Sequence, residues 1–293
     1  KLDYSIQISK LFYSRFLKNE DITLFSPHEV KGLYEAFGTD AFDELYEKYE
    51  RATSISKTKV SARELFTDLL KERAETGRIY IMNIDHCNEH SSFTDKVNMS
   101  NLCQEITLPT DPISHIDGEG EIALCILSAI NVGTIKMDEL SNLCDLAVRG
   151  LEELIDFQEY PVEAAKRSTL ARRSLGIGYI GLAHFLAKNK VKYDDPEAHK
   201  LVHELSEAFQ YHLLCASNQI ASEKGPCEYY DRTKYAQGKL PIDHYKKEVD
   251  TIWRKFCETL FYVLIAIVNR SCITKLVHQE VDFVLSSGDA DHC

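Results

Sequence analysis

Two short runs of almost uninterrupted apolar residues place the strongest limit on the fold of this chain. They are RIYIMNID at residues 78–85 and IALCILSAINVG at residues 122–133. A strand that is apolar on both faces has to be covered on both faces, as in the parallel sheets and barrels of α/β proteins. Periodic apolar residues predict long helices at 137–157 and 197–223. We therefore expect an α/β fold that is rich in helix.

The residues before the first apolar run are mostly helical in their periodicity. KLDYSIQISKLFYSRFL (1–17) predicts the middle of an amphipathic helix, and the same spacing recurs at 33–37, 42–49 and 62–70. A Ser-Pro pair predicts a turn before the second helix, with Pro27 at the first helical position. The polar residues 86–100 predict a loop, and ITLP (106–109) predicts a strand or the end of one.

Length and composition bound the class of protein. The chain has 293 residues, enough for one large or two ordinary domains, and its formal net charge of −12 argues against general binding to nucleic acid backbones. Its nine cysteines contain no short-range framework of the secreted kind, so we expect a reducing cytoplasm. The longest apolar run, LFYVLIAIV (260–268), is less than half of the ~20 residues that span a membrane, so we expect it in the core.

Two motifs have both a functional and a structural interpretation. GIGYIG (176–181) matches the glycine pattern of dinucleotide-binding folds, but that fingerprint needs an apolar strand before it, and AAKRSTLARRSL precedes it here. Close helix packing or a tight turn explains these glycines better. HCNEH (86–90) could hold a metal on a helix, but no second ligand cluster has a suitable spacing, so a structural loop is the preferred interpretation. The many helical carboxylates are expected on solvated faces.

SNLCQEITLP (100–109) places an amide, a thiol and a carboxyl group on alternate positions: Asn101, Cys103 and Glu105. In an extended chain, side chains two positions apart share a face, so these three would point into one space. A buried amide and carboxylate cost free energy unless polar partners satisfy them, so we expect a polar ligand. A thiol for attack or redox chemistry, a carboxylate that accepts a proton and an amide that holds a hydroxyl form a coherent catalytic set.

The alternative for any cysteine is packing as a small hydrophobic residue. We give that interpretation to Cys144, Cys215, Cys257 and Cys272. Cys125 differs because it lies in the second apolar run. If that strand lies near residues 101–105 in a sheet, Cys125 could face the same pocket as a reducing thiol.

SNLCQEITLPT (100–110), followed by GEIALCILSAINVG (120–133), resembles the core of the large, catalytic subunit of class I ribonucleotide reductase, of the enterobacterial and T-even phage type. Further segments fit the same family in the same order. They are LFSPHEVKGLYEAF (24–37), TGRIYIMNIDHCNEHSSF (76–93), AAKRSTLARRSLGIGYIGLAHFLAK (164–188) and KLPIDHYKKEVDTI (239–252). Several long motifs in one order make the resemblance specific, and it covers residues 1–252.

The resemblance implies part of a ten-stranded α/β barrel with a central finger loop that carries the active cysteine. By residue, it implies that Cys103 becomes a thiyl radical and removes the 3′ hydrogen of a ribonucleotide. Glu105 takes the 3′ hydroxyl proton, and Asn101 hydrogen-bonds the substrate. Cys125 matches one of two cysteines that reduce the 2′ position and end as a disulfide, with its partner outside this chain. The pocket is expected to exclude water.

The resemblance also implies a ribonucleoside-diphosphate reductase that makes deoxyribonucleotides for DNA synthesis. Its expected partners are the ribonucleoside diphosphate, a small subunit whose metal centre supplies the radical, a second large subunit, and thioredoxin or glutaredoxin. No cofactor or metal is expected on this chain directly, although nucleotide effectors regulate the family. Neither a membrane nor a nucleic acid is an expected partner.

Residues 253–293 have no counterpart that the resemblance identifies, and we treat them as a divergent tail. The chain begins at Lys1 and lacks the family's Ser/Thr-rich phosphate loop and its paired relay tyrosines. Tyr229 and Tyr230 belong to another segment. We therefore expect an internal fragment that cannot reduce nucleotides alone, and its alternative is a split-subunit piece or inactive remnant that only binds partner chains. A further alternative is a glycyl-radical or cobalamin-dependent reductase, but the sequence of such an enzyme should differ from this chain outside the finger loop.

Overall fold

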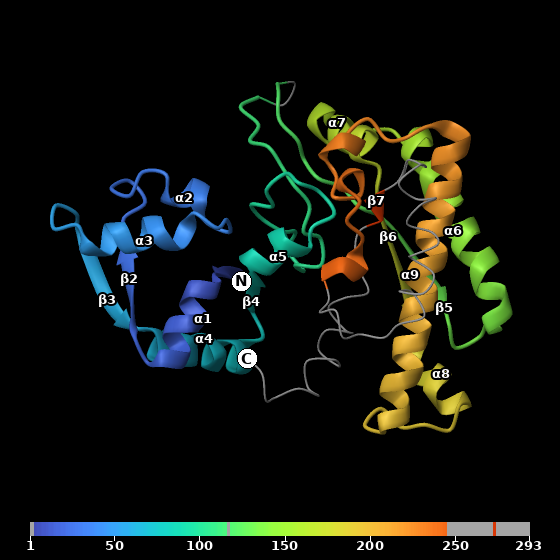
Figure 1. Cartoon of the computed structure of the whole chain (residues 1–293), viewed down its shortest axis with the longest axis horizontal. Coiled ribbons are helices and arrows are strands. Elements are labelled where there is room, and N and C mark those ends of the chain that lie inside the picture. Colours follow the sequence, from blue (N-terminus) through green and yellow to red (C-terminus); the bar gives the residue numbers. More distant parts are fainter. Residues whose placement is uncertain (1–2, 116–117, 245–271, 274–293) are drawn as a thin grey trace. The chain divides into compact units, whose positions relative to one another are not determined.

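The computed structural model describes residues 3–115, 118–244 and 272–273, and the chain divides into two compact units. The first unit comprises residues 1–91 and 96–109, and the second comprises residues 92–95 and 110–293. Figure 1 shows the described helices and strands in sequence colours, and each unit is described by itself below. The predicted tail (253–293) lies outside the described residues, apart from two of them, and so does the apolar run at 260–268.

The first unit holds two small sheets and the helices around them (Figure 1). β1 pairs with β4 in parallel, and β2 pairs with β3 in antiparallel fashion. Its elements are β1 (Tyr4–Ile8), α1 (Lys10–Lys18), β2 (Asp21–Phe25), α2 (Leu33–Ala36), α3 (Phe42–Arg51), β3 (Lys57–Ser61), α4 (Ala62–Thr76), β4 (Ile79–Asn83) and α5 (Ile84–His90). The helices predicted at 33–37, 42–49 and 62–70 and the strand predicted at 78–85 are therefore confirmed.

Three local predictions for this unit are wrong. Residues 4–8 form a strand rather than the middle of a helix, because Ser9 caps α1 and accepts a hydrogen bond from the Phe12 N–H at 3.4 Å. Pro27 lies in a turn that Glu29 closes onto Ser26, well before α2 begins. Residues 86–90 are helical in α5 rather than a loop.

The second unit contains a parallel sheet in the order β5, β6, β7. Its strands are β5 (Ile126–Asn131), β6 (Ser174–Ile180) and β7 (Cys272–Ile273), and its α-helices are α6 (Leu140–Phe157), α7 (Glu163–Arg172), α8 (Leu182–Lys188) and α9 (Pro196–Lys224). Short 3-10 turns cover Met137–Glu139, Tyr230–Arg232, Tyr235–Gln237 and Pro241–His244. The predicted helices at 137–157 and 197–223 are confirmed, and so is the α/β, helix-rich class.

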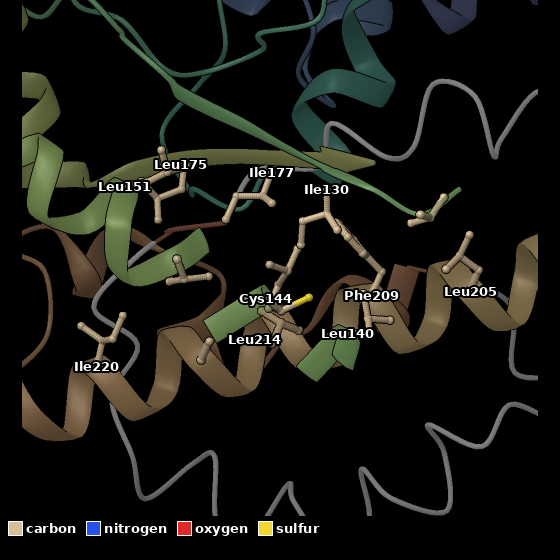
Figure 2. Packing of buried hydrophobic residues seen from close by; sticks show 14 of the residues in the cluster. Ile130, Leu140, Cys144, Leu151, Leu175, Ile177, Leu205, Phe209, Leu214 and Ile220 are labelled. Carbon is tan, nitrogen blue, oxygen red and sulfur yellow. The ribbon is translucent and has the colours of Figure 1, made fainter. Parts of the chain in front are cut away.

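The core of the second unit lies between this sheet and the helices α6 and α9. Figure 2 shows apolar side chains from the two strands, such as Ile130 and Ile177, directed toward those of α6 and α9, including Cys144 and Phe209. Burial of this apolar surface stabilises the unit, and the apolar periodicity of the long helices predicts it. The predicted packing role of Cys144 is confirmed, because its side chain is fully buried here.

GIGYIG does not form a nucleotide-binding turn, and most of it is strand β6. Gly176 and Gly178 alternate with neighbours whose side chains fill the core, so the strand is buried despite its glycines. Gly181 starts α8 with φ +80°, and a Cβ there would lie 2.3 Å from the Asn131 side-chain oxygen. Glycine is therefore required at this one position by both conformation and space. The strand itself was missed by the sequence analysis.

The expectation that helical carboxylates are solvated is wrong for Glu152 of α6. Its side chain is buried and pairs with Arg173 at 2.6 Å, while Asp156 binds the same guanidinium at 2.8 Å. Burial alone would lower the pKa of Arg173, but the hydrogen bonds to Asp156 and Glu152 outweigh it and raise that pKa above its ordinary value.

The structure shows neither a closed barrel nor a ten-stranded sheet, because the described strands form sheets of two, two and three strands. The sequence run ITLP (106–109) forms no strand, and the bridge that follows it joins Asp111 to Glu121. Within the part of the chain that the structure describes, no helix combines the length and apolarity needed to cross a membrane.

Replacing Phe209 with alanine should lower the free energy of unfolding by about 3–5 kcal/mol, because a large buried ring leaves a cavity that its neighbours cannot close. Phe209 is 0% exposed and packs edge-on against Tyr179 with ring centroids 5.5 Å apart. Phe157→Ala on α6 is the matched control, since that ring is 86% exposed. Urea denaturation of both variants measures the difference, and equal losses would contradict this account of the core.

Candidate active site

Residues 96–109, here called the thiol loop, carry Asn101, Cys103 and Glu105 in the first unit. The loop is not extended at these positions. The Gln104 N–H donates to the Asn101 carbonyl at 3.2 Å, and Gln104 has a left-handed φ of 64°. These features make a tight turn, so the prediction that alternation along a strand brings the three side chains to one face is wrong.

The turn nevertheless brings the amide and the carboxylate together. Asn101 Nδ2 donates to Glu105 Oε1 at 2.6 Å, and Asn101 Oδ1 accepts from the Ile106 N–H at 3.1 Å. These bonds orient the Asn101 amide, and an ionised carboxylate makes the first of them a strong one. The Asn101 and Glu105 side chains, four positions apart, therefore meet across a turn, whereas the sequence pattern predicted that they would meet on one face of a strand.

One oxygen of Glu105 is left without a hydrogen-bond donor. Its Oε2 atom is buried and has no partner among the residues that the structure describes. Buried carboxylate oxygens are normally satisfied, and an orphan indicates a donor that is absent, such as a ligand hydroxyl or a water. In the Asn101–Glu105 pair, one carboxylate oxygen thus accepts a hydrogen bond and the other can accept one from a ligand.

Cys103 lies within the turn, between the two polar residues in sequence, and it is exposed. It does not pack as a small hydrophobic residue, which was the alternative interpretation. The contrast is with Cys144 in the core, where burial raises the thiol pKa to about 12. The expected water-poor enclosure of Cys103 is not formed by the described residues and stays a prediction.

The first unit fixes the thiol loop at both ends of its turn. The Val97 N–H donates to Asn88 Oδ1 at 2.8 Å, and Gln7 Nε2 of β1 donates to the Asn98 carbonyl at 2.9 Å. The buried Gln104 side chain donates to the Ser5 hydroxyl, also on β1. Pairing of β1 with β4 therefore positions the loop that carries the thiol.

Cys125 lies in the second unit, immediately before β5, and is half-buried. Its sulfur lies 4.0 Å from the Ile126 carbonyl oxygen, the distance of a weak S–H contact. Because each unit is described by itself, a pocket shared by Cys125 and Cys103 stays a prediction.

The HCNEH segment lies on α5, where His86 and His90 have ring centroids 6.4 Å apart. Glu89 is engaged by Lys10 at 2.7 Å, and this hydrogen bond lowers the pKa of the carboxyl group. Across residues 3–115, 118–244 and 272–273, no group of three or more His, Cys, Asp or Glu side chains could hold a metal ion. The described part of the chain therefore offers no ligand set for the metal interpretation.

Sequence reasoning missed a cluster of paired charges, here called the arginine cluster: Asp95, Glu121, Arg172 and Arg232. Arg172 binds Asp95 at 2.8 Å and Glu121 at 2.7 Å. Burial alone would raise the pKa of Asp95, but the hydrogen bonds from Arg232 and Arg172 outweigh it and lower that pKa. The sequence feature that could have indicated this cluster is the pair of adjacent arginines, Arg172 and Arg173, between the end of α7 and the buried strand β6.

We expect Cys103 to react with iodoacetamide under native conditions at least about a hundredfold faster than Cys144, because thiolates react and the buried thiol is both inaccessible and hard to deprotonate. Peptide mapping by mass spectrometry over a time course measures both rates in one sample. Labelling in denaturant, where the rates should converge, is the control. Slow labelling of Cys103 in the native chain would contradict the exposed turn.

Comparisons with known proteins identify the family. Residues 1–264 match the family described as "Ribonucleotide reductase, barrel domain". The chain is 57% identical over 258 residues to a ribonucleoside-diphosphate reductase subunit alpha of Haemophilus influenzae, and 55% identical over 258 residues to the ribonucleoside-diphosphate reductase 1 subunit alpha of Escherichia coli. The subunit alpha of Enterobacteria phage T4 is 44% identical over 260 residues.

Each of these alignments covers 86% of this chain but 34% of the relative, so the chain spans about a third of the length of the curated relatives that it matches. The family match extends beyond residue 252, where the sequence resemblance was expected to end, and the boundary between barrel domain and tail stays a prediction. With most of its length inside this match, the chain belongs to the ribonucleotide reductase barrel-domain family.

Proposed function

We propose that this chain provides the hydrogen-abstracting cysteine and part of the sugar site of a ribonucleoside-diphosphate reductase. The observation that carries the proposal is the turn in the thiol loop. In this turn an exposed Cys103 lies in sequence between Asn101 and Glu105, which are hydrogen-bonded to each other, and one buried oxygen of Glu105 has no donor among the described residues. A ribose hydroxyl is a donor of the kind this oxygen lacks.

The roles that we assign follow from the chemistry of the sugar. A ribose C–H bond is too inert for acid or base catalysis, so the sulfur of Cys103 acts as a radical that removes the 3′ hydrogen. Glu105 accepts the 3′ hydroxyl proton, and Asn101 holds the substrate in place. The 2′ hydroxyl then leaves as water. Cys125 and a second cysteine supply two electrons and two protons, one proton leaving in the water and one going to the 2′ carbon, and become a disulfide. Cys103 then returns the hydrogen to the 3′ carbon and is a radical again, and Glu105 returns its proton to the 3′ oxygen.

The proposal includes partners. The matched relatives are named as alpha subunits, which supports a second kind of subunit in the assembly. We assign to it the radical-generating role and a metal centre. Thioredoxin or glutaredoxin would reduce the disulfide, nucleotide effectors and a second large subunit would regulate the assembly, and a reducing cytoplasm suits all of these thiols.

Because the chain spans about a third of its relatives, the test supplies the rest. The chain is assayed for reduction of a ribonucleoside diphosphate with a small subunit and dithiothreitol, first alone and then with the remaining parts of the Haemophilus influenzae subunit alpha. We expect no turnover alone and measurable turnover after complementation. Turnover by the chain alone would refute this expectation, and co-purification of the parts without any activity would favour the alternative, a chain that only binds its partners.

In the complemented assay, we expect Cys103→Ser to abolish turnover, because an oxygen-centred group cannot take over the thiyl role. Glu105→Gln should lower kcat by about 10²–10⁴-fold, since the amide keeps the shape but cannot accept a proton. Cys87→Ser, a half-buried thiol on α5 in the same unit, is the matched control and should retain activity. Turnover by Cys103→Ser at the unaltered rate would overturn the proposal.

A further inference from the structure

The arginine cluster of the second unit is a closed ring of two cations and two carboxylates. Arg172 donates from Nε to Glu121 at 2.7 Å and from Nη1 to Asp95 at 2.8 Å. Arg232 binds the other oxygens of the same two residues, with Asp95 at 2.8 Å and Glu121 at 3.7 Å. The Arg172 side chain is 2% exposed, so its charge depends on both carboxylates for compensation.

Aromatic rings complete the surroundings of both guanidinium groups. The Cζ atom of Arg172 lies 4.8 Å from the ring centroid of Phe93 and 5.1 Å from that of Tyr229. Arg232 lies over the same Tyr229 ring at 4.2 Å. Planar guanidinium groups stack on such rings, and a lysine ammonium in the same place could neither stack nor bind two carboxylates through a fork.

One carboxylate adjoins the start of the thiol loop in sequence, and the other is joined through the backbone to a residue just after the end of the loop. Asp95 immediately precedes residue 96, the first of the loop. On the other side, Asp111 follows residue 109 by two positions and is joined to Glu121 by a pair of backbone hydrogen bonds of 3.3 and 3.1 Å. One guanidinium therefore ties together the points where the chain enters and leaves the loop.

Further hydrogen bonds within the second unit support both flanks independently. On the entry side, Thr94 N–H donates to the Arg232 carbonyl at 2.8 Å, and Phe93 forms a bridge with Thr233. On the exit side, Arg167 of α7 donates to the Gly120 carbonyl at 2.7 Å. The arginine cluster lies where these two sets of contacts meet.

We infer that Arg172 is a positioning residue for the thiol loop, which it restrains by holding both of its ends. Fixing the ends of a flexible segment removes many of its conformations, and a buried guanidinium that bridges two carboxylates through charge-assisted hydrogen bonds does so with a defined geometry. In consequence, the segments that flank the thiol loop along the chain are held within the second unit, while the turn that carries Cys103 is held by its own contacts with β1. The catalytic part of this inference rests on the proposed function, whereas the structural part does not.

The structural test is hydrogen exchange of the full chain, followed by mass spectrometry. Arg172→Lys keeps the positive charge but loses the guanidinium that bridges the two carboxylates. Arg232→Gln is the second variant. Its side chain is 37% exposed, so this variant decides the question if Arg172→Lys does not fold. We expect exchange in peptides that cover residues 96–109 to accelerate about ten- to a hundredfold, the range expected for a lost charge-assisted hydrogen bond, while peptides of α6 and α9 stay unchanged.

The matched control is Arg149→Gln, which removes an equally well-paired arginine of α6 that binds Asp145 and Glu223 outside the arginine cluster. It should leave the thiol loop unchanged. Unaltered exchange of residues 96–109 in the folded variants would overturn the inference, and so would an acceleration that is equal in the loop and in α6 and α9, because that reports general destabilisation.

The catalytic readout uses the complemented assay. For the Arg232→Gln variant we expect kcat to fall by about tenfold or more while KM is unchanged. The substrate contacts are intact, but the Cys103 thiol is no longer held in its productive position. A change in KM alone would contradict a positioning role. If the unaltered complemented chain shows no turnover, the proposed function fails, and the exchange experiment still decides the structural inference.

Discussion

The buried charge of Arg172 is the interaction on which the segments that flank the thiol loop along the chain depend. An unpaired guanidinium inside a protein would cost several kcal/mol, so Asp95 and Glu121 stabilise the second unit by compensating this charge. These carboxylates belong to segments far apart from α7 in sequence. Satisfying one charge therefore joins, within the second unit, the segments that precede and follow residues 96–109 in sequence.

The rest of the structure supports this cluster through apolar packing. The helices α6 and α9 cover one side of β5 and β6, and α7 leads directly into β6. Arg172 and Arg173 lie at that junction and point to different partners, the first to the arginine cluster and the second to Glu152 and Asp156. Two groups of ion pairs therefore lie where α7 ends and β6 begins.

Much of the fold was predictable from the sequence, because long helices with one apolar face leave a clear period. The α6 and α9 predictions succeeded for that reason. β6 was missed because its glycines lack the side chains that mark a strand, and its identity depends on pairing with β5. α5 was missed because HCNEH is polar, although Ile84 anchors its first turn in the core.

The chemistry of Asn101, Cys103 and Glu105 stays a prediction from their residue types. Their conformation was predicted wrongly, because these residues form a turn rather than an extended strand. The arginine cluster could not be predicted, because its four members are scattered over residues 95–232 and come together only through the tertiary fold. Charge pairs of this kind leave no period in a sequence.

We propose that the sulfur of Cys103 meets the ribose of a nucleotide. The rate of alkylation of Cys103 in the complemented subunit, with and without a saturating ribonucleoside diphosphate, tests this directly. We expect the nucleotide to slow the labelling of Cys103 several-fold and to leave that of Cys87 unchanged. Labelling of Cys103 at the same rate with and without the nucleotide would contradict it.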